Sequence, residues 1–341
     1  MQRRDMPDPR DMAIDSTATR IDAGTEDDAQ AARPPSEPDT VAVEPRPDAA
    51  HYPRGEFLER SFSNAAGARK YKVYVPVGYS VSSTGPLPMI VMLHGCTQSP
   101  DDFAAGTRMN ALADIHGFFV VYPAQSANAN MQKCWNWFRS EDQAREAGEP
   151  AIIAGITREI ASTYRIDARR IFVAGMSAGA AMAIILGATY PDLYAAIGVH
   201  SGLAYAAAHD MPSAFGAMHG AAAPPPARSS AFPTIVFHGD NDRTVAASNA
   251  TTIVEHVVAG YGREALRREV TTGTAAGGRT YTRTNFANAS NQVLAEQWTL
   301  HGAGHAWSGG SSSGSFTDAR GPDASKEMIR FFYSVPRAGT A

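Results

Sequence analysis

A short stretch of small residues, GMSAGAAMA from Gly175 to Ala183, surrounds a single hydroxyl, that of Ser177. The stretch fits the pattern GxSxG, follows the apolar run IFVAG and precedes an alanine-rich segment. In a sharp strand-to-helix turn, bulky residues flanking the serine would collide with adjacent backbone. The helix that follows directs its amide groups toward charge that develops near the serine oxygen. The pattern predicts a nucleophile at Ser177; the alternative is a helix N-cap in a closely packed Gly/Ala helix.

A serine hydroxyl needs a base, and the base needs an orienting carboxylate, in the chain order serine, acid, histidine for this kind of turn. The motif FHGDNDRTV places Asp240 and Asp242 directly after an apolar run. We expect Asp242 to be the acid, because two further residues carry it beyond the strand end toward a histidine loop. Asp240 is expected to bond local amides in the turn, a role that is also the alternative for Asp242.

The motif LHGAGHAWSGG follows the last apolar run and contains two histidines. We expect His305, between two small residues in a loop, to be the base, and His301, at the strand end, to be structural. His94, His200 and His238 also end apolar runs, but no HExxH or other paired spacing favours a metal centre. The predicted chemistry, acyl transfer to a serine, needs no metal and no cofactor.

Acyl transfer also needs two donors for the oxyanion of the tetrahedral intermediate. The amide of Ala178, directly after the predicted nucleophile, is the first candidate. The amide of Cys96, in the motif MLHGCTQ after another apolar run, is the second. The alternative for Cys96 is a small buried residue.

The chain has only two cysteines, Cys96 and Cys134, which excludes a four-cysteine zinc site and a disulfide-rich scaffold. A disulfide between them is possible and would tie the Cys96 loop to the motif KCWNWF. Aromatic residues would then wall the cleft, although such clusters are more often core. The candidate substrate-binding residues are Trp135, Trp137 and Trp307, with Phe138 beside them.

Alternating apolar and helical patterns predict the elements that position these residues. The expected strands span residues 70–75, 88–93, 118–122, 170–175, 195–200, 234–239 and 293–300. The expected helices span residues 102–115, 150–164, 178–190, 246–260 and 323–333. This alternation predicts an α/β fold with a mainly parallel sheet covered on both faces. Residues 203–232 are expected to form an irregular excursion over the carboxyl edge of the sheet.

Composition separates a tail from a globular body. The first 50 residues contain no aromatic residue, seven prolines, and twelve acidic residues against six arginines, which predicts a disordered tail over residues 1–53. We expect a catalytic domain over 54–335 and a short tail over 336–341. With the −6 of those first 50 residues removed from a net charge of −4, the body is near neutral, which argues against nucleic acid as a partner. No apolar run is long enough to span a membrane, and no signal peptide is visible.

Six motifs in register resemble one known family, the esterases related to polyhydroxybutyrate depolymerase with a type 1 catalytic domain. They are LHGCTQSPDDFAAGTRMNALAD, VVYPAQSANANMQKCWNWF, GMSAGAAMA, VHSGL, FHGDNDRTV and GAGHAWSGG. The resemblance covers about residues 54–333 and implies an α/β-hydrolase with Ser177 as nucleophile, Asp242 as acid and His305 as base. It implies the cleavage of 3-hydroxyalkanoate esters.

Related members imply a second candidate function, the cleavage of feruloyl or acetyl esters on plant polysaccharides. Soluble polyester oligomers or small esters are expected as substrates rather than solid polymer. The resemblance implies an extracellular location, and the lack of a visible signal peptide leaves a cytoplasmic one as the alternative. A rival from another class is a non-catalytic, granule-binding protein that kept the fold. No pattern indicates the oligomeric state.

Overall fold

The computed structural model describes residues 55–82, 84–221 and 231–335, which belong to one compact unit, Tyr52–Ala341. The expected tails over residues 1–53 and 336–341 lie outside the described residues.

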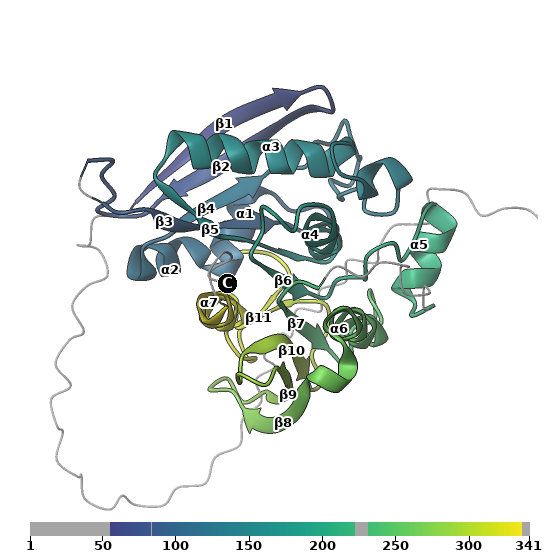
Figure 1. Ribbon diagram of the computed structural model, residues 1–341. Coiled ribbons are helices and arrows are strands. Elements are labelled where there is room, and N and C mark those ends of the chain that lie inside the picture. Colours follow the sequence, from purple (N-terminus) through teal and green to yellow (C-terminus); the bar gives the residue numbers. More distant parts are fainter. Residues whose placement is uncertain (1–54, 83, 222–230, 336–341) are drawn as a thin grey trace, which may run out of the picture. The chain divides into compact units, whose positions relative to one another are not determined.

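A ten-stranded mixed sheet forms the centre of this unit (Figure 1). Its strands, in spatial order, are β1 (Glu56–Asn64), β2 (Gly67–Val75), β4 (Phe119–Pro123), β3 (Leu87–Leu93), β5 (Ile166–Met176), β6 (Ala196–His200), β7 (Thr234–Gly239), β10 (Val293–Leu300), β9 (Thr280–Ala287) and β8 (Arg267–Thr274). The strands from β4 to β10 in that order are parallel, and the two outer strands on each side are antiparallel. The mainly parallel sheet predicted from the sequence is confirmed, and the arrangement is that of an α/β-hydrolase.

Helices cover both faces of the sheet. One face packs against α3 (Gly148–Thr163), α4 (Ala178–Thr189) and α6 (Ser248–Tyr261), and the other against α1 (Pro100–Thr107), α2 (Met109–His116) and α7 (Ala324–Ser334). Successive strand residues point to opposite faces: Val173 of β5 enters the first hydrophobic core and Phe172 the second. Burial on both faces explains why the central strands are nearly continuous apolar runs.

Several elements differ from the prediction. The helix expected over 102–115 is two helices, because Arg108 adopts a left-handed backbone conformation with φ 55°. Strands β1, β8 and β9 were not predicted, since they are rich in polar residues and contain few fully buried positions at the sheet margins. The excursion expected over 203–232 contains a helix, α5 (Met211–Met218), capped by the Asp210 side chain. Short strands β11 (Trp307–Ser308) and β12 (Thr317–Asp318) pair separately.

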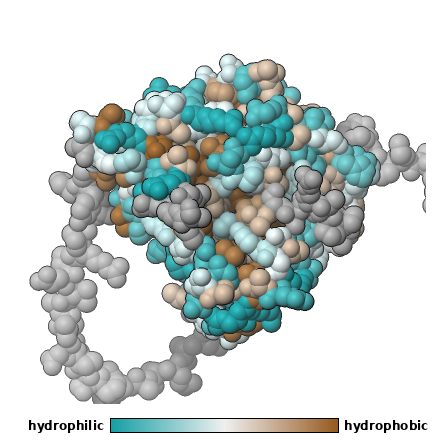
Figure 2. Space-filling view, in the orientation of Figure 1, coloured by the Kyte–Doolittle hydropathy of each residue, from teal (hydrophilic) through white to brown (hydrophobic). Residues whose placement is uncertain are grey.

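The surface is mostly hydrophilic on the face shown in Figure 2, where hydrophobic residues form small separate patches. Scattered apolar residues of this kind are normal on a globular protein. Among the described residues, no helix has the length and apolar character needed to cross a membrane.

Candidate active site

Ser177 stands at the turn between β5 and α4. Its backbone has φ 55° and ψ −122°, a combination that non-glycine residues rarely adopt. A Cβ at Gly179 would collide with the carbonyl oxygen of Leu93, and one at Gly175 would collide with the backbone of Gly179. The small residues of the motif therefore permit α4 to start directly against the end of β3. The predicted strand–turn–helix geometry around Ser177 is present.

Asp242 and His305 form a hydrogen-bonded pair. His305 Nδ1 lies 2.7 Å from Asp242 Oδ2, and the Asp242 side chain is fully buried. The amides of Thr244 and Val245 donate to Asp242 Oδ1, both at 2.9 Å. Burial acts to raise the pKa of the Asp242 carboxyl, but hydrogen bonds from His238 and His305 lower it far below its usual range. Asp242 is thus held as a carboxylate that orients the His305 ring.

Asp240 and His301 form a second pair beside the first. His301 Nδ1 lies 2.9 Å from Asp240 Oδ2, the Gly302 amide donates to Asp240 Oδ1 at 2.6 Å, and His301 Nε2 lies 2.9 Å from the Thr282 hydroxyl. Both ring nitrogens of His301 are therefore occupied. The structural role expected for this histidine and the turn role expected for Asp240 match these contacts.

His200, at the end of β6, connects the Ser177 turn to the His305 loop, a contribution that the sequence did not reveal. Its backbone carbonyl accepts the Ser177 amide at 2.9 Å, and its Nε2 accepts the Ser308 amide at 3.0 Å. Burial lowers the pKa of His200 to about 3, so the ring stays neutral and can accept this bond. In the sequence, a histidine that links two loops in this way looks the same as a histidine that only packs in the core at a strand end.

The two atoms predicted to react, the Ser177 hydroxyl oxygen and His305 Nε2, have no partner in the part of the chain that the structure describes. The amides of Cys96 and Ala178 likewise have no acceptor among the described residues. A Cβ built on Gly95, next to Cys96, would lie 3.6 Å from Ser177 Cβ, so the Cys96 loop borders the serine. The predicted nucleophile, base and oxyanion donors are therefore all free to contact a ligand. Within the described residues, no group of three or more His, Cys, Asp or Glu side chains is arranged so that it could hold a metal ion.

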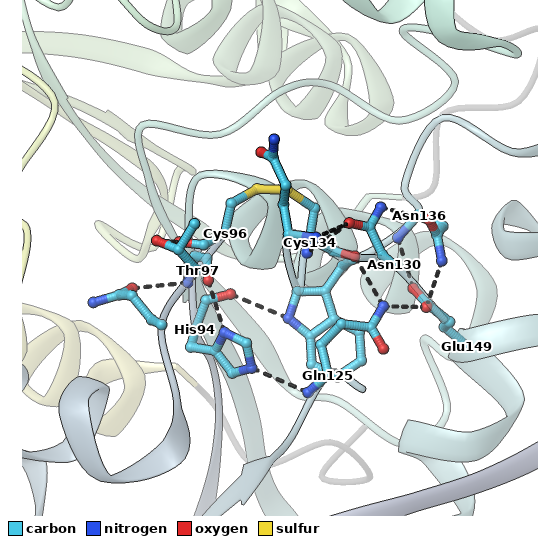
Figure 3. The surroundings of a disulfide bond; sticks show 12 residues. His94, Cys96, Thr97, Gln125, Asn130, Cys134, Asn136 and Glu149 are labelled. Atoms are coloured by element: carbon cyan, nitrogen blue, oxygen red, sulfur yellow. Dashed lines mark hydrogen bonds between the residues drawn. A yellow bond between two sulfur atoms is a disulfide. The ribbon is translucent and has the colours of Figure 1, made fainter. Parts of the chain in front are cut away.

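A disulfide joins Cys96 to Cys134, as Figure 3 shows, and confirms the pairing considered from the sequence. The expected role of the tryptophans as walls of a cleft requires a correction. Trp135 and Trp307 are fully buried, and Trp137 is buried in the same hydrophobic core as Trp135. The Trp135 indole donates to the His94 carbonyl at 3.1 Å, and the Trp307 indole donates to the Ser325 hydroxyl at 3.1 Å. Trp135 and Trp307 therefore pack inside the two hydrophobic cores, where their indole nitrogens find hydrogen-bond partners.

A solved structure supports the fold assignment. The acetyl xylan esterase from Aspergillus awamori superposes with a TM-score of 0.64 at 19% identity, covering 82% of this chain and 100% of the other. Identity at this level shows a shared fold.

Comparison with related sequences identifies the family. Poly(3-hydroxyalkanoate) depolymerase C of Paucimonas lemoignei is 32% identical over 256 residues, 71% of this chain and 59% of the relative. Feruloyl esterase B of Neurospora crassa is 36% identical over 146 residues, 42% of this chain and 47% of the relative. The chain thus spans about half of the length of these relatives. The sequence model described as Esterase PHB depolymerase matches residues 69–262, more than half of the chain. The chain therefore belongs to the Esterase PHB depolymerase family.

Proposed function

We propose that this chain is a serine ester hydrolase that works through an acyl-enzyme. The observation that carries the proposal is the buried Asp242–His305 pair, at 2.7 Å, combined with a serine on a sharp turn whose hydroxyl has no partner among the described residues. Asp242 fixes the His305 tautomer with the proton on Nδ1, which leaves Nε2 as the base.

The proposed reaction has two halves. Ser177 Oγ attacks the ester carbonyl while His305 Nε2 takes the hydroxyl proton, and the amides of Ala178 and Cys96 bind the oxyanion. Collapse breaks the ester bond, and His305 returns the proton to the departing alcohol. Water, deprotonated by His305, then attacks the acyl-enzyme, releases the acid and restores Ser177. The proposal includes a hydrogen bond between His305 Nε2 and the Ser177 hydroxyl that forms with substrate bound, because such catalytic hydrogen bonds often tighten only then.

For the substrate, we propose soluble oligomers of short-chain 3-hydroxyalkanoates. The family and the relative named poly(3-hydroxyalkanoate) depolymerase C support this choice. Feruloyl or acetyl esters of plant polysaccharides are the second candidate, supported by the relative named feruloyl esterase B. For the location, the Cys96–Cys134 disulfide supports an oxidising, extracellular compartment.

The test is the release of 3-hydroxybutyrate from its linear trimer by wild type and by Ser177→Ala, with a feruloyl sugar ester and an acetylated xylo-oligosaccharide assayed in parallel. Cleavage of the trimer that disappears in Ser177→Ala is the expected result. Cleavage of only the sugar esters would retain the mechanism and replace the substrate. Equal activity of the two proteins on every ester would overturn the mechanism.

A further inference from the structure

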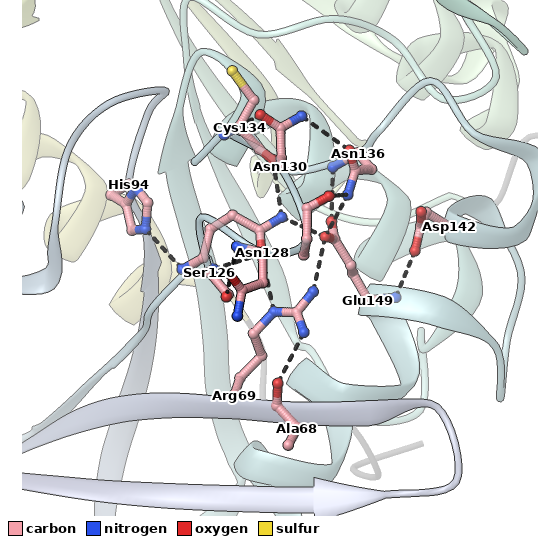
Figure 4. Close-up of polar contacts among 12 residues, drawn as sticks. Ala68, Arg69, His94, Ser126, Asn128, Asn130, Cys134, Asn136, Asp142 and Glu149 are labelled. Atoms are coloured by element: carbon pink, nitrogen blue, oxygen red, sulfur yellow. Dashed lines mark hydrogen bonds and ion pairs between the residues drawn. The ribbon is translucent and has the colours of Figure 1, made fainter. Parts of the chain in front are cut away.

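The buried carboxylate of Glu149, which is not one of the proposed catalytic residues, accepts hydrogen bonds from several donors. Glu149 lies in the first turn of α3 and is 3% exposed. Four donors from three residues converge on its two oxygens (Figure 4). The Asn136 amide donates at 2.7 Å, Asn136 Nδ2 at 2.9 Å and an Arg69 terminal nitrogen at 3.1 Å, and Gln125 Nε2 donates as well. A carboxylate offers about four lone-pair sites, so the number of donors around Glu149 matches the number that its carboxylate can take, with three at Oε1 and one at Oε2.

These donors fix one particular loop, residues 124–138, which follows β4. Gln125 and Asn136 stand near its two ends, and Arg69 on β2 also donates to Gln125 Oε1 at 2.9 Å. Glu149 and Arg69 therefore hold both ends of the loop against α3 and β2. Inside the loop, Asn130 Nδ2 donates to Asn136 Oδ1 at 3.1 Å, which ties the loop's interior to the same centre.

Loop 124–138 in turn contacts the residues around Cys96 and holds them in place. Besides the disulfide from Cys134, the Thr97 amide donates to the Gln132 carbonyl at 2.6 Å. The Gln125 amide donates to His94 Nε2 at 3.1 Å, and the Trp135 indole donates to the His94 carbonyl (Figure 3). His94 and Thr97 flank the Cys96 amide in the sequence, so contacts from the loop fix the backbone close to that amide on both sides.

This backbone needs external support. Thr97 has φ 66° and Lys133, next to Cys134, has φ 53°. Non-glycine residues rarely adopt this left-handed conformation, and they keep it only where surrounding contacts impose it. Both turns that carry the disulfide therefore depend on contacts such as those of the loop.

We propose that Glu149 is a positioning residue for one of the two oxyanion donors: it fixes loop 124–138, and the loop holds the Cys96 amide in place. The inference rests on the proposed function, in which that amide binds the developing oxyanion. Glu149 itself touches no substrate. Its role requires a carboxylate, because the amide of a glutamine would direct its own N–H groups at donors that already converge there.

The experiment compares Glu149→Gln with a matched control on the same helix, Glu159→Gln. Glu159 accepts the Tyr71 hydroxyl at 2.5 Å and has no contact with the loop among those described. Hydrolysis of p-nitrophenyl butyrate gives kcat and KM. Inhibition by a trifluoromethyl ketone, which forms a tetrahedral adduct with serine, reports oxyanion binding, and inhibition by butyrate reports ground-state binding.

We expect Glu149→Gln to lower kcat about 10- to 100-fold, less than the loss of a whole oxyanion donor, with little change in KM. Affinity for the ketone should fall in parallel, while affinity for butyrate and the behaviour of Glu159→Gln stay at the wild-type level. If Glu149→Gln does not fold, Asn136→Ala, which keeps the Arg69–Glu149 ion pair, should show the same split.

A wild-type kcat in folded Glu149→Gln, or an effect confined to KM, would overturn the inference. The proposed function would still stand if hydrolysis by the wild type depended on Ser177. Hydrolysis that persists in Ser177→Ala would overturn both.

Discussion

Two Asp–His pairs lie side by side in this protein and have opposite surroundings. Asp242–His305 and Asp240–His301 use aspartates from the loop after β7 and histidines that follow β10, with contacts of 2.7 Å and 2.9 Å. The Asp242 and His305 side chains are 0% and 12% exposed, whereas those of Asp240 and His301 are 40% and 41% exposed. Similar contact distances therefore do not imply similar roles.

The difference lies in the second nitrogen of each ring. His301 Nε2 is occupied by the Thr282 hydroxyl, and His305 Nε2 has no partner among the described residues. The Asp240–His301 pair also accompanies contacts between the two loops: the Asp240 amide donates to the Leu300 carbonyl at 3.1 Å and the Asn241 amide to the Ala303 carbonyl at 3.0 Å. Both pairs join the two loops, but only the Asp242–His305 pair leaves a ring nitrogen free, as the proposed proton transfer requires.

The largest expected effect is on catalysis. Asp242→Asn should lower kcat by about 10⁴-fold, because an amide favours the wrong tautomer of the histidine. Asp240→Asn should leave kcat nearly unchanged, because His301 has no free nitrogen. Steady-state kinetics on p-nitrophenyl butyrate measures both, and comparable losses in the two variants would abolish the distinction between the pairs.

The next effect is on stability in acid. In both aspartates burial acts to raise the pKa, but hydrogen bonds from the histidines and nearby groups lower it below the ordinary value of 3.8. The stability that each contributes is present above about pH 4 and is lost as the pH falls.

Removing the carboxylate of Asp242 should cost on the order of 2 kcal/mol or more at pH 7, and removing that of exposed Asp240 about 1 kcal/mol or less. Urea unfolding of both Asp→Asn variants at pH 7 and pH 3 checks this, with the differences from wild type shrinking at pH 3. The same pH dependence in both variants would contradict it.

A third aspartate, without a histidine, should respond to pH in the opposite direction. Burial, reinforced by the charge of Glu149, raises the pKa of Asp142 to about 6. Its contribution to stability is therefore fully present below about pH 3.8 and is lost as the pH rises through 6. Asp142→Asn should remove this decline, worth about 1–2 kcal/mol after allowance for solvent. Thermal unfolding of wild type and variant between pH 4 and pH 7 measures this decline. A decline of the same size in Asp142→Asn would contradict its assignment to Asp142.

The smallest effect concerns Thr282. Thr282→Val removes the partner of His301 Nε2 and should cost about 1 kcal/mol or less of stability, with kcat/KM unchanged. A fall in kcat/KM would show that the outer pair takes part in the chemistry. Denaturant unfolding and kinetics on one preparation separate the two readouts.

Much of the candidate site could be predicted from the sequence, because each of its residues lies within a few positions of the end of an apolar run. Parallel strands bring their carboxyl ends to one edge, so Ser177 after β5, Asp242 after β7 and His305 after β10 converge. The catalytic roles of these residues remain predictions.

Other features could not be predicted, for physical reasons. Trp135 gives the same sequence pattern whether it lines a cleft or fills a core, and only its burial decides. Glu149 is one of several acidic residues in the stretch SEDQAREAGEP. Its donors come from positions 69, 125 and 136, which only the fold brings together. Arg108 is a good helix former, and Gly106 and Thr107 before it are only a weak signal, so the break between α1 and α2 was not predicted.

The outermost strands also protect the chain against aggregation. An open sheet has two edges with unpaired backbone groups, here those of β1 and β8. Exposed charged side chains on both edge strands disfavour pairing with another chain. They are Glu56 and Glu59 on β1, and Arg267, Arg268 and Glu269 on β8. Heating that releases the β8–β9 hairpin first would uncover the apolar edge of β10, and intermolecular strand pairing would begin there.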